Sequence, residues 1–74
     1  MTEWKYRVRH DAKRETFNYK QGCFASLDVA NEVFDGIKDE LNGESFTIIL
    51  EEVDRDYMGF VRPVRTIKKE IINK

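Results

Sequence analysis

The single cysteine and the single histidine of this 74-residue chain, Cys23 and His10, are the residues that could support nucleophilic catalysis. A cysteine nucleophile needs an imidazole within hydrogen-bond reach and a third group that orients the imidazole. The two residues fall on different predicted strands, and neither lies in a recognisable motif. We therefore expect Cys23 to be a small core residue and the protein not to be an enzyme.

Two aspartates, Asp54 and Asp56, have the opening spacing of a calcium loop of the EF-hand type. The later positions fail, because Met58 and Arg65 stand where an oxygen ligand and a bidentate glutamate are required. A nonspecific divalent site completed by Glu52 is the alternative to ordinary Asp-rich turn chemistry. The four glycines are isolated, so no phosphate-binding glycine loop is present. We expect neither a metal nor a cofactor.

Binding of an anionic nucleotide in a cleft between subunits is a further chemical possibility. Guanidinium groups bind phosphates with paired hydrogen bonds, and aromatic rings can stack on bases. The residues that could do this are Trp4, Arg7, Arg9, Tyr57, Arg62 and Arg65. Nucleic-acid binding has less support, because the rings near the N-terminus alternate to the face opposite the cations and the sequence pI is about 5.8.

The N-terminal half of the chain predicts two strands and a helix. Alternating apolar and polar residues at 4–10 and 15–20 predict a β-hairpin whose second strand ends at Gly22. Ser26 is the expected N-cap of the helix, and Asn42-Gly43 is the expected stop. The helix is predicted by an apolar stripe at spacings of three and four: Leu27, Ala30, Val33, Phe34, Ile37 and Leu41.

The C-terminal half predicts two more strands. Residues 45–53 are apolar on both faces, as in a strand that is covered on both sides or used for association on one of them. A turn at 54–59 leads to a last strand over 60–67, where Pro63 favours an edge position or a bulge. Residues 66–73 fit a short helix as well as a continued strand.

The element order β-β-α-β-β predicts one small α+β domain over residues 1–74. We expect a mostly antiparallel sheet with the amphipathic helix packed on one face. The rings expected in the core under the helix are Trp4, Tyr6, Phe17, Tyr19, Phe24, Phe34, Phe46 and Phe60. Regular strands cannot bring every apolar residue to that face, which leaves interface candidates on the other: Ile49, Val53, Val61 and Ile67.

Charge is distributed unevenly along a chain whose net charge is −1. Residues 1–20 sum to +3, residues 21–56 to −8 and residues 57–74 to +4. These sums predict a basic sheet side and an acidic helix surface that carries Asp28, Glu32, Asp35 and Asp39. Either such charges are simply solvated, or the opposite faces meet in an oligomer or a partner complex.

The composition also bears on the oligomeric state of the protein and on its location in the cell. A core this small is marginal by itself, and the lone cysteine offers no disulfide within the chain. We therefore expect self-association through the open sheet face, most simply as a dimer, and a protein partner. The charged N-terminal segment and the absence of an 18-residue apolar run favour a cytoplasmic protein, of the producing or infected cell, without a membrane span.

The chain is short and poor in cysteine, with the helix FASLDVANEVFDGIKDELNG between hairpins and the strand TIILEEVDRD. In these respects it resembles the small accessory proteins of bacterial viruses and prophages. The resemblance implies an inhibitor of host proteins or a scavenger of a signalling nucleotide. The sequence thus favours a non-enzymatic interaction protein, with an anionic-ligand binder and a nucleic-acid-binding module as alternatives.

Overall fold

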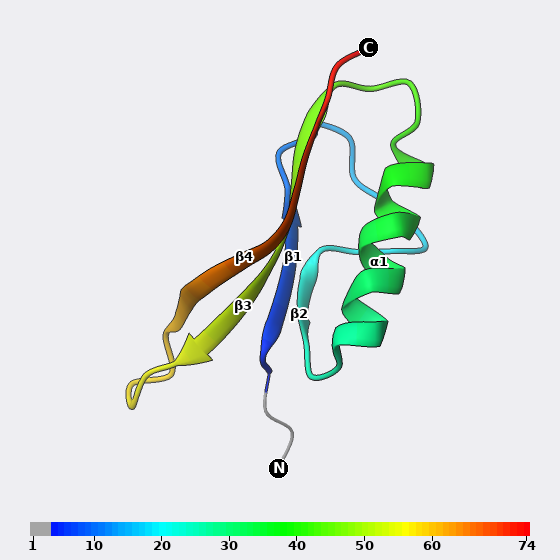
Figure 1. The fold of residues 1–74 in the computed structure, drawn as a ribbon. Helices are drawn as coiled ribbons and strands as arrows, with labels where there is room; N and C mark the ends of the chain where they lie inside the picture. The colour runs from blue at the N-terminus through cyan, green and yellow to red at the C-terminus, as the bar shows by residue number, and fades with distance from the viewer. Residues whose placement is uncertain (1–3) are drawn as a thin grey trace.

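The computed structural model describes residues 4–74 as four strands and one helix (Figure 1). In chain order the elements are β1 (Tyr6–His10), β2 (Gly22–Phe24), α1 (Leu27–Glu40), β3 (Phe46–Arg55) and β4 (Val61–Ile72). Neighbouring strands are antiparallel throughout, and their order in the sheet is β2-β1-β3-β4. The predicted α+β fold and element order are confirmed.

Helix α1 forms where the apolar stripe predicted it. The Ser26 hydroxyl caps its first turn by accepting the backbone N–H of Val29. The helix ends at Glu40 with Leu41 as its C-cap, and Gly43 follows with a φ of +96°, a conformation that glycine adopts most readily. Leu27 stays partly exposed, while the other residues of the stripe are buried: Ala30, Val33, Phe34, Ile37 and Leu41.

The core lies between α1 and one face of the sheet. The strand residues that complete it are Val8, Phe46, Ile48 and Leu50, each at most 5% exposed. Val8 pairs with Leu50 in the register of β1 and β3, so even-numbered residues of these two strands face the helix. Odd-numbered residues of the same strands therefore make up the open face of the sheet.

Strands β3 and β4 continue beyond the helix as a projecting hairpin (Figure 1). The molecule is accordingly elongated, with extents of 40 × 19 × 19 Å. We call residues 54–64 the hairpin arm. Its turn is closed by a bond from the backbone N–H of Asp56 to the carbonyl of Phe60, and Gly59 provides the left-handed φ of +89°.

Strand β4 lies at the edge of the sheet, as Pro63 predicted. Two shifts in register interrupt its pairing with β3, and Pro63 follows the second shift. The alternative of a C-terminal helix is wrong, because β4 runs as a strand to Ile72. The first shift leaves Ile67 without a partner in β3, and its side chain packs against the core. Ile67 therefore does not face away from the helix, because the strand is irregular.

The predicted strand over residues 15–20 is wrong. These residues belong to a loop over 11–21, and β1 pairs instead with β2, which begins at Gly22. The carboxylate of Glu40, at the end of α1, accepts the backbone N–H groups of residues 17–19. Because these donors bond to a side chain, they are not available to a strand ladder.

Three rings that were predicted for the core are exposed instead: Trp4 at 41%, Phe17 at 90% and Phe60 at 64%. Phe17 lies in the loop over 11–21 and Phe60 in the hairpin arm, so neither ring lies under the helix. Of the other rings, Phe34 and Phe46 are buried, and Tyr6, Tyr19 and Phe24 pack around them.

Candidate interaction surfaces

The cysteine and histidine that could have formed a nucleophilic site do not meet. Cys23 pairs with Arg7 and so lies on the open face of the sheet. His10 pairs with Ile48 on the helix face, and its Nδ1 accepts the backbone N–H of Ala12 at 3.2 Å. A thiol and an imidazole on opposite faces of a sheet cannot exchange a proton directly.

The acidic residues near the turn are engaged within the protein. The Asp56 carboxylate accepts two backbone N–H groups of the turn, at 2.9 and 3.0 Å. Asp54 accepts the N–H of the next residue, and Glu52 pairs with Arg65 at 2.7 Å. Within residues 4–74 no group of three or more His, Cys, Asp and Glu side chains is placed to hold a metal ion.

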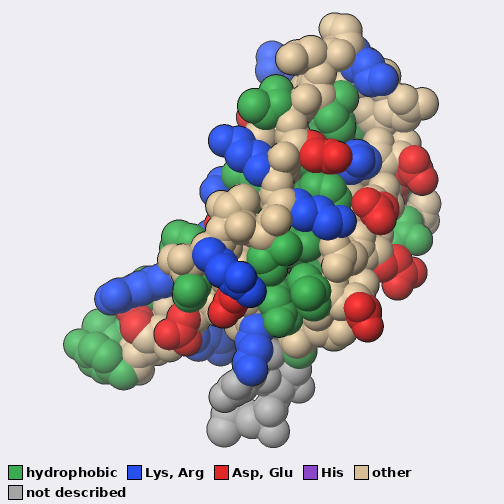
Figure 2. All heavy atoms as spheres, in the orientation of Figure 1, with side chains coloured by type: hydrophobic (Ala, Val, Ile, Leu, Met, Phe, Trp, Pro, Cys, Tyr) green, Lys and Arg blue, Asp and Glu red, His purple; other side chains and the backbone are tan. Residues whose placement is uncertain are grey.

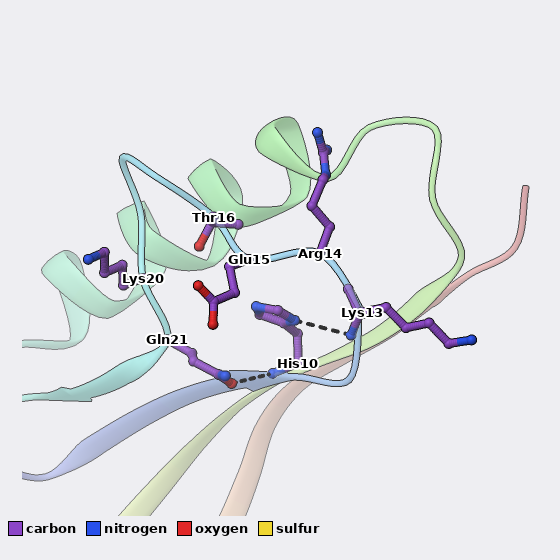
Figure 3. Close-up of a pocket in the computed structure, with 8 residues that line it drawn as sticks. His10, Lys13, Arg14, Glu15, Thr16, Lys20 and Gln21 are labelled. Carbon is purple, nitrogen blue, oxygen red and sulfur yellow. Dashed lines mark hydrogen bonds between the residues drawn. The ribbon is translucent and has the colours of Figure 1, made fainter.

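The loop over residues 11–21 borders an open polar cavity of about 440 Å³ next to His10, at the end of β1 (Figure 3). It is lined by His10, Ala12, Lys13, Arg14, Glu15, Thr16, Lys20 and Gln21. The imidazole of His10 and the carboxylate of Glu15 point into this space, whereas Lys13 and Lys20 point away from it (Figure 3). The cavity therefore lacks the convergent cations that a phosphate group would need.

The loop is anchored to the C-terminal end of α1. Arg14 donates to the Glu40 carbonyl oxygen and pairs with Glu44 at 2.6 Å. Desolvation would raise the pKa of the Glu40 carboxyl, but bonds from the N–H groups of residues 17–19 and the charge of Arg14 outweigh it and lower the pKa. The ring of Tyr19 lies on Gly36, where any Cβ would overlap it. The loop is thus an integral part of the domain body.

A buried carboxylate organises the open face of the sheet. The side chain of Glu51 is 3% exposed and accepts from Nε of Arg7 at 2.6 Å and Nε of Arg9 at 3.0 Å. Such burial is favourable only when the charge is paired and hydrogen-bonded. Glu51 was not among the residues predicted for a site. The available signal was an acidic residue inside an apolar strand, together with a strand that reads Arg-Val-Arg.

The four interface candidates do not form one patch. Ile49 is half-buried on the open face, next to Lys69 of β4. Val53 is 4% exposed but lies outside the main core cluster, and Val61 is half-buried in the hairpin arm. Ile67 packs against the core. Ile49 and Val53, as odd-numbered residues of β3, lie on the open face, where Val53 is already buried.

The four acidic helix residues do share a surface. They are exposed on the side of α1 that faces away from the core (Figure 2): Asp28, Glu32, Asp35 and Asp39. None of them forms a salt bridge with a residue in the described range 4–74. The nearby Lys38 pairs with Glu70 of β4 at 2.5 Å, and this bond, opposed by desolvation, raises the pKa of Lys38.

The tip of the hairpin arm carries a cluster of exposed apolar side chains (Figure 2). The exposed fractions are 97% for Tyr57, 66% for Met58 and 64% for Phe60. Val64, at the base of the arm, is 56% exposed. The sequence predicted the turn but not the arm, because projection beyond the helix depends on how far β3 and β4 pair past the core.

The six nucleotide-binding candidates lie in three separate places. Trp4 precedes the start of β1, Arg7 and Arg9 are on the open face, and Tyr57, Arg62 and Arg65 are in or next to the hairpin arm. Each arginine already faces a carboxylate: Arg7 and Arg9 face Glu51, Arg62 faces Asp56 at 3.6 Å, and Arg65 faces Glu52. The fold therefore does not gather these six residues around one ligand.

Among residues 4–74, no helix has both the length and the apolar character needed to cross a lipid bilayer. The chain has no significant match among family models, curated proteins or solved structures. Its surfaces are therefore the basis on which a function can be inferred.

Proposed function

We propose that this protein acts by binding another protein, without catalysis, and that the tip of the hairpin arm is its binding element. The observation that carries the proposal is the exposure of Tyr57, Met58 and Phe60 together at the end of a projecting hairpin. Contiguous exposed apolar surface on a small protein commonly marks an interaction site. Aromatic side chains and methionine are also enriched where protein interfaces are most buried.

The construction of the turn supports this role. The Asp56 carboxylate holds two backbone N–H groups of the turn, and Arg62 lies 3.6 Å from the same carboxylate. A turn that is already ordered loses less conformational entropy when it binds. The aspartate and the arginine would also form a polar rim around the apolar tip, as at other protein interfaces. A narrow projecting tip suits an apolar cleft in the partner.

The test is to capture partners from lysate of the cells that make the protein. A Tyr57→Ser/Met58→Ser/Phe60→Ser variant should lose a partner that the unchanged protein retains. The matched control is Phe17→Ser, which removes another exposed ring, 90% exposed, from the loop over residues 11–21. Retention of every partner by the triple variant, with its thermal unfolding unchanged, would overturn the proposal.

The two alternatives have less support. An anionic-ligand binder needs convergent unpaired cations, whereas the four candidate arginines are dispersed and face carboxylates. Thermal shifts against a nucleotide panel would reveal such a ligand. Nucleic-acid binding would appear as salt-dependent retention on DNA or RNA. Inhibition of a host protein, which the resemblance to phage accessory proteins implies, is one outcome that binding through the hairpin arm could have.

A further inference from the structure

Two surfaces of opposite charge lie on opposite sides of the molecule. The acidic helix surface consists of Asp28, Glu32, Asp35 and Asp39 on the outward side of α1. The cationic sheet surface consists of Lys5, Arg7, Arg9 and Lys69, which alternation and register place on the open face. Helix α1 covers one face of the sheet and leaves the other uncovered by any described element (Figure 1).

The net charges of these surfaces are opposite in sign and similar in size. The cationic sheet surface contains four cations and one carboxylate, that of Glu51, whose side chain is 3% exposed. The acidic helix surface contains four carboxylates, and none of them is in a salt bridge with a residue of the described range. Each surface thus carries charge that the molecule itself does not neutralise.

The dimensions of the two surfaces are also compatible. One row across β1, β3 and β4 consists of Arg9, Ile49 and Lys69. Because neighbouring strands are about 5 Å apart, the two cations of the row are separated by about 10 Å. An α-helix with its side chains is about 10 Å wide. Each surface also has an exposed apolar side chain near its charges. These are Val29 of α1, which is 46% exposed, and Ile71 beside the row on the sheet, which is 64% exposed.

We propose that the acidic helix surface of one copy docks on the cationic sheet surface of a second copy. The contact joins two different surfaces, so each added copy leaves one surface of each kind free. Assembly then grows into chains or closes into rings, rather than stopping at the symmetric dimer that size alone suggested. The contact gives a geometry to the expected self-association and does not involve the hairpin arm.

The association should be weak and sensitive to salt. A 14-residue helix is about 21 Å long, which places the contact at the small end of protein interfaces. Its charges are mostly exposed, and the Debye length falls from about 10 Å at 0.1 M salt to about 3 Å at 1 M. Sedimentation equilibrium should therefore give an average mass that rises with protein concentration in 50 mM salt and returns to the monomer mass in 1 M salt.

Charge exchange between two variants provides the decisive test. The helix variant is Glu32→Lys/Asp35→Lys/Asp39→Lys, which leaves Asp28 in the first helical turn where a carboxylate is favourable. The sheet variant is Lys5→Glu/Lys69→Glu, which leaves the pairing of Glu51 intact. Alone, each variant carries like charge on both surfaces and should stay monomeric in 50 mM salt. An equimolar mixture restores opposite charges and should regain a mass above the monomer.

A control for net charge is Lys13→Glu/Lys20→Glu, which makes the same change as the sheet variant but in the loop over 11–21. This control should associate as the unchanged protein does. The proposal is overturned if the unchanged protein is monomeric at millimolar concentration in low salt, if either variant associates alone, or if the mixture stays monomeric. Partner capture by the hairpin arm is measured separately, so its failure and the failure of this proposal are distinguishable.

Discussion

The domain body and the hairpin arm differ in how far their side chains are buried and paired. In the body, polar groups that lose water gain partners: Glu51 is held by two arginines, and Glu40 by three backbone N–H groups. The described exception is the side-chain oxygen of Asn31, which is buried without a hydrogen bond. In the arm, by contrast, Tyr57 and Phe60 keep most of their apolar surface in water. The difference indicates that the body provides stability, whereas the arm leaves exposed the apolar surface that we propose for binding.

This division predicts large stability effects in the body and small ones in the arm. The largest is expected at Leu50, which is fully buried under α1. Leu50→Ala should lower the free energy of unfolding by about 3 kcal/mol through lost burial and a residual cavity. Urea denaturation followed by circular dichroism measures this change. A loss below about 1 kcal/mol would mean that the core under the helix is not what stabilises the domain.

The next effect is expected at Glu51, whose removal leaves two arginines without their shared carboxylate. Fully buried pairs lose roughly 3–5 kcal/mol when one partner is removed, and partial exposure of Arg7 and Arg9 should reduce the loss to about 2 kcal/mol for Glu51→Gln. Glu52→Gln is the matched control, because its pair with Arg65 is exposed and should contribute below about 1 kcal/mol. Equal losses in the two variants would contradict a structural role for the buried carboxylate.

Gly36→Ala separates helix propensity from packing. Alanine would ordinarily stabilise the interior of a helix by about 1 kcal/mol relative to glycine. Here the new Cβ overlaps the ring of Tyr19, so we expect a net loss of about 1 kcal/mol and faster proteolysis of the loop over 11–21. Limited proteolysis with mass spectrometry locates the cleavage. A stabilised variant with an intact loop would show that Tyr19 does not pack on the helix.

A pH dependence should come from Glu40. Its folded-state pKa is lowered from the ordinary value of 4.5, so the ionised carboxylate contributes stability above pH 4.5. That contribution is lost as the pH falls through the folded-state pKa, because the folded state must then accept a proton that it binds less readily. Glu40→Gln should therefore flatten the acid limb of a plot of melting temperature against pH. An unchanged acid limb would count against the bonds to the loop.

The smallest stability effects are expected in the arm. Tyr57→Ser and Phe60→Ser should each change the free energy of unfolding by less than about 0.5 kcal/mol, because both rings are largely exposed already. Chemical denaturation of each variant checks this against Leu50→Ala. A loss above about 1 kcal/mol would show that the arm folds back on the body in solution and does not project from it.

The sequence predicted the features that depend on local pattern. The stripe of α1 and the cap at Ser26 are set by neighbours within a few residues, and both are confirmed. The prediction of a strand over 15–20 is wrong, because the carboxylate of Glu40, far along the chain, accepts backbone N–H groups of the loop. The prediction that Ile67 faces away from the helix is wrong, because a bulge in β4 breaks the alternation of side chains along the strand. Long-range hydrogen bonds and register shifts leave no periodic trace in the sequence.

The candidate surfaces also differ in whether local sequence pattern predicts them. Exposure of the acidic helix residues follows from helical periodicity, and Asp28 to Asp39 lie where periodicity placed them. The cluster around Glu51 and the projection of Tyr57 and Phe60 depend on the register between strands and on the length of their pairing. Neither quantity can be read from one strand in isolation.

The central claim, that the hairpin arm is the part of the molecule that contacts a partner, can be tested by proximity. A photoreactive phenylalanine derivative is placed at Tyr57 in one sample and at Phe17 in another, and each is irradiated in the cells that make the protein. Both positions are at least 90% exposed, so the probe should disturb neither the core nor the sheet. We predict cross-linking to another protein from position 57 and not from position 17. Cross-links of equal yield from both positions, or none from position 57, would contradict the account.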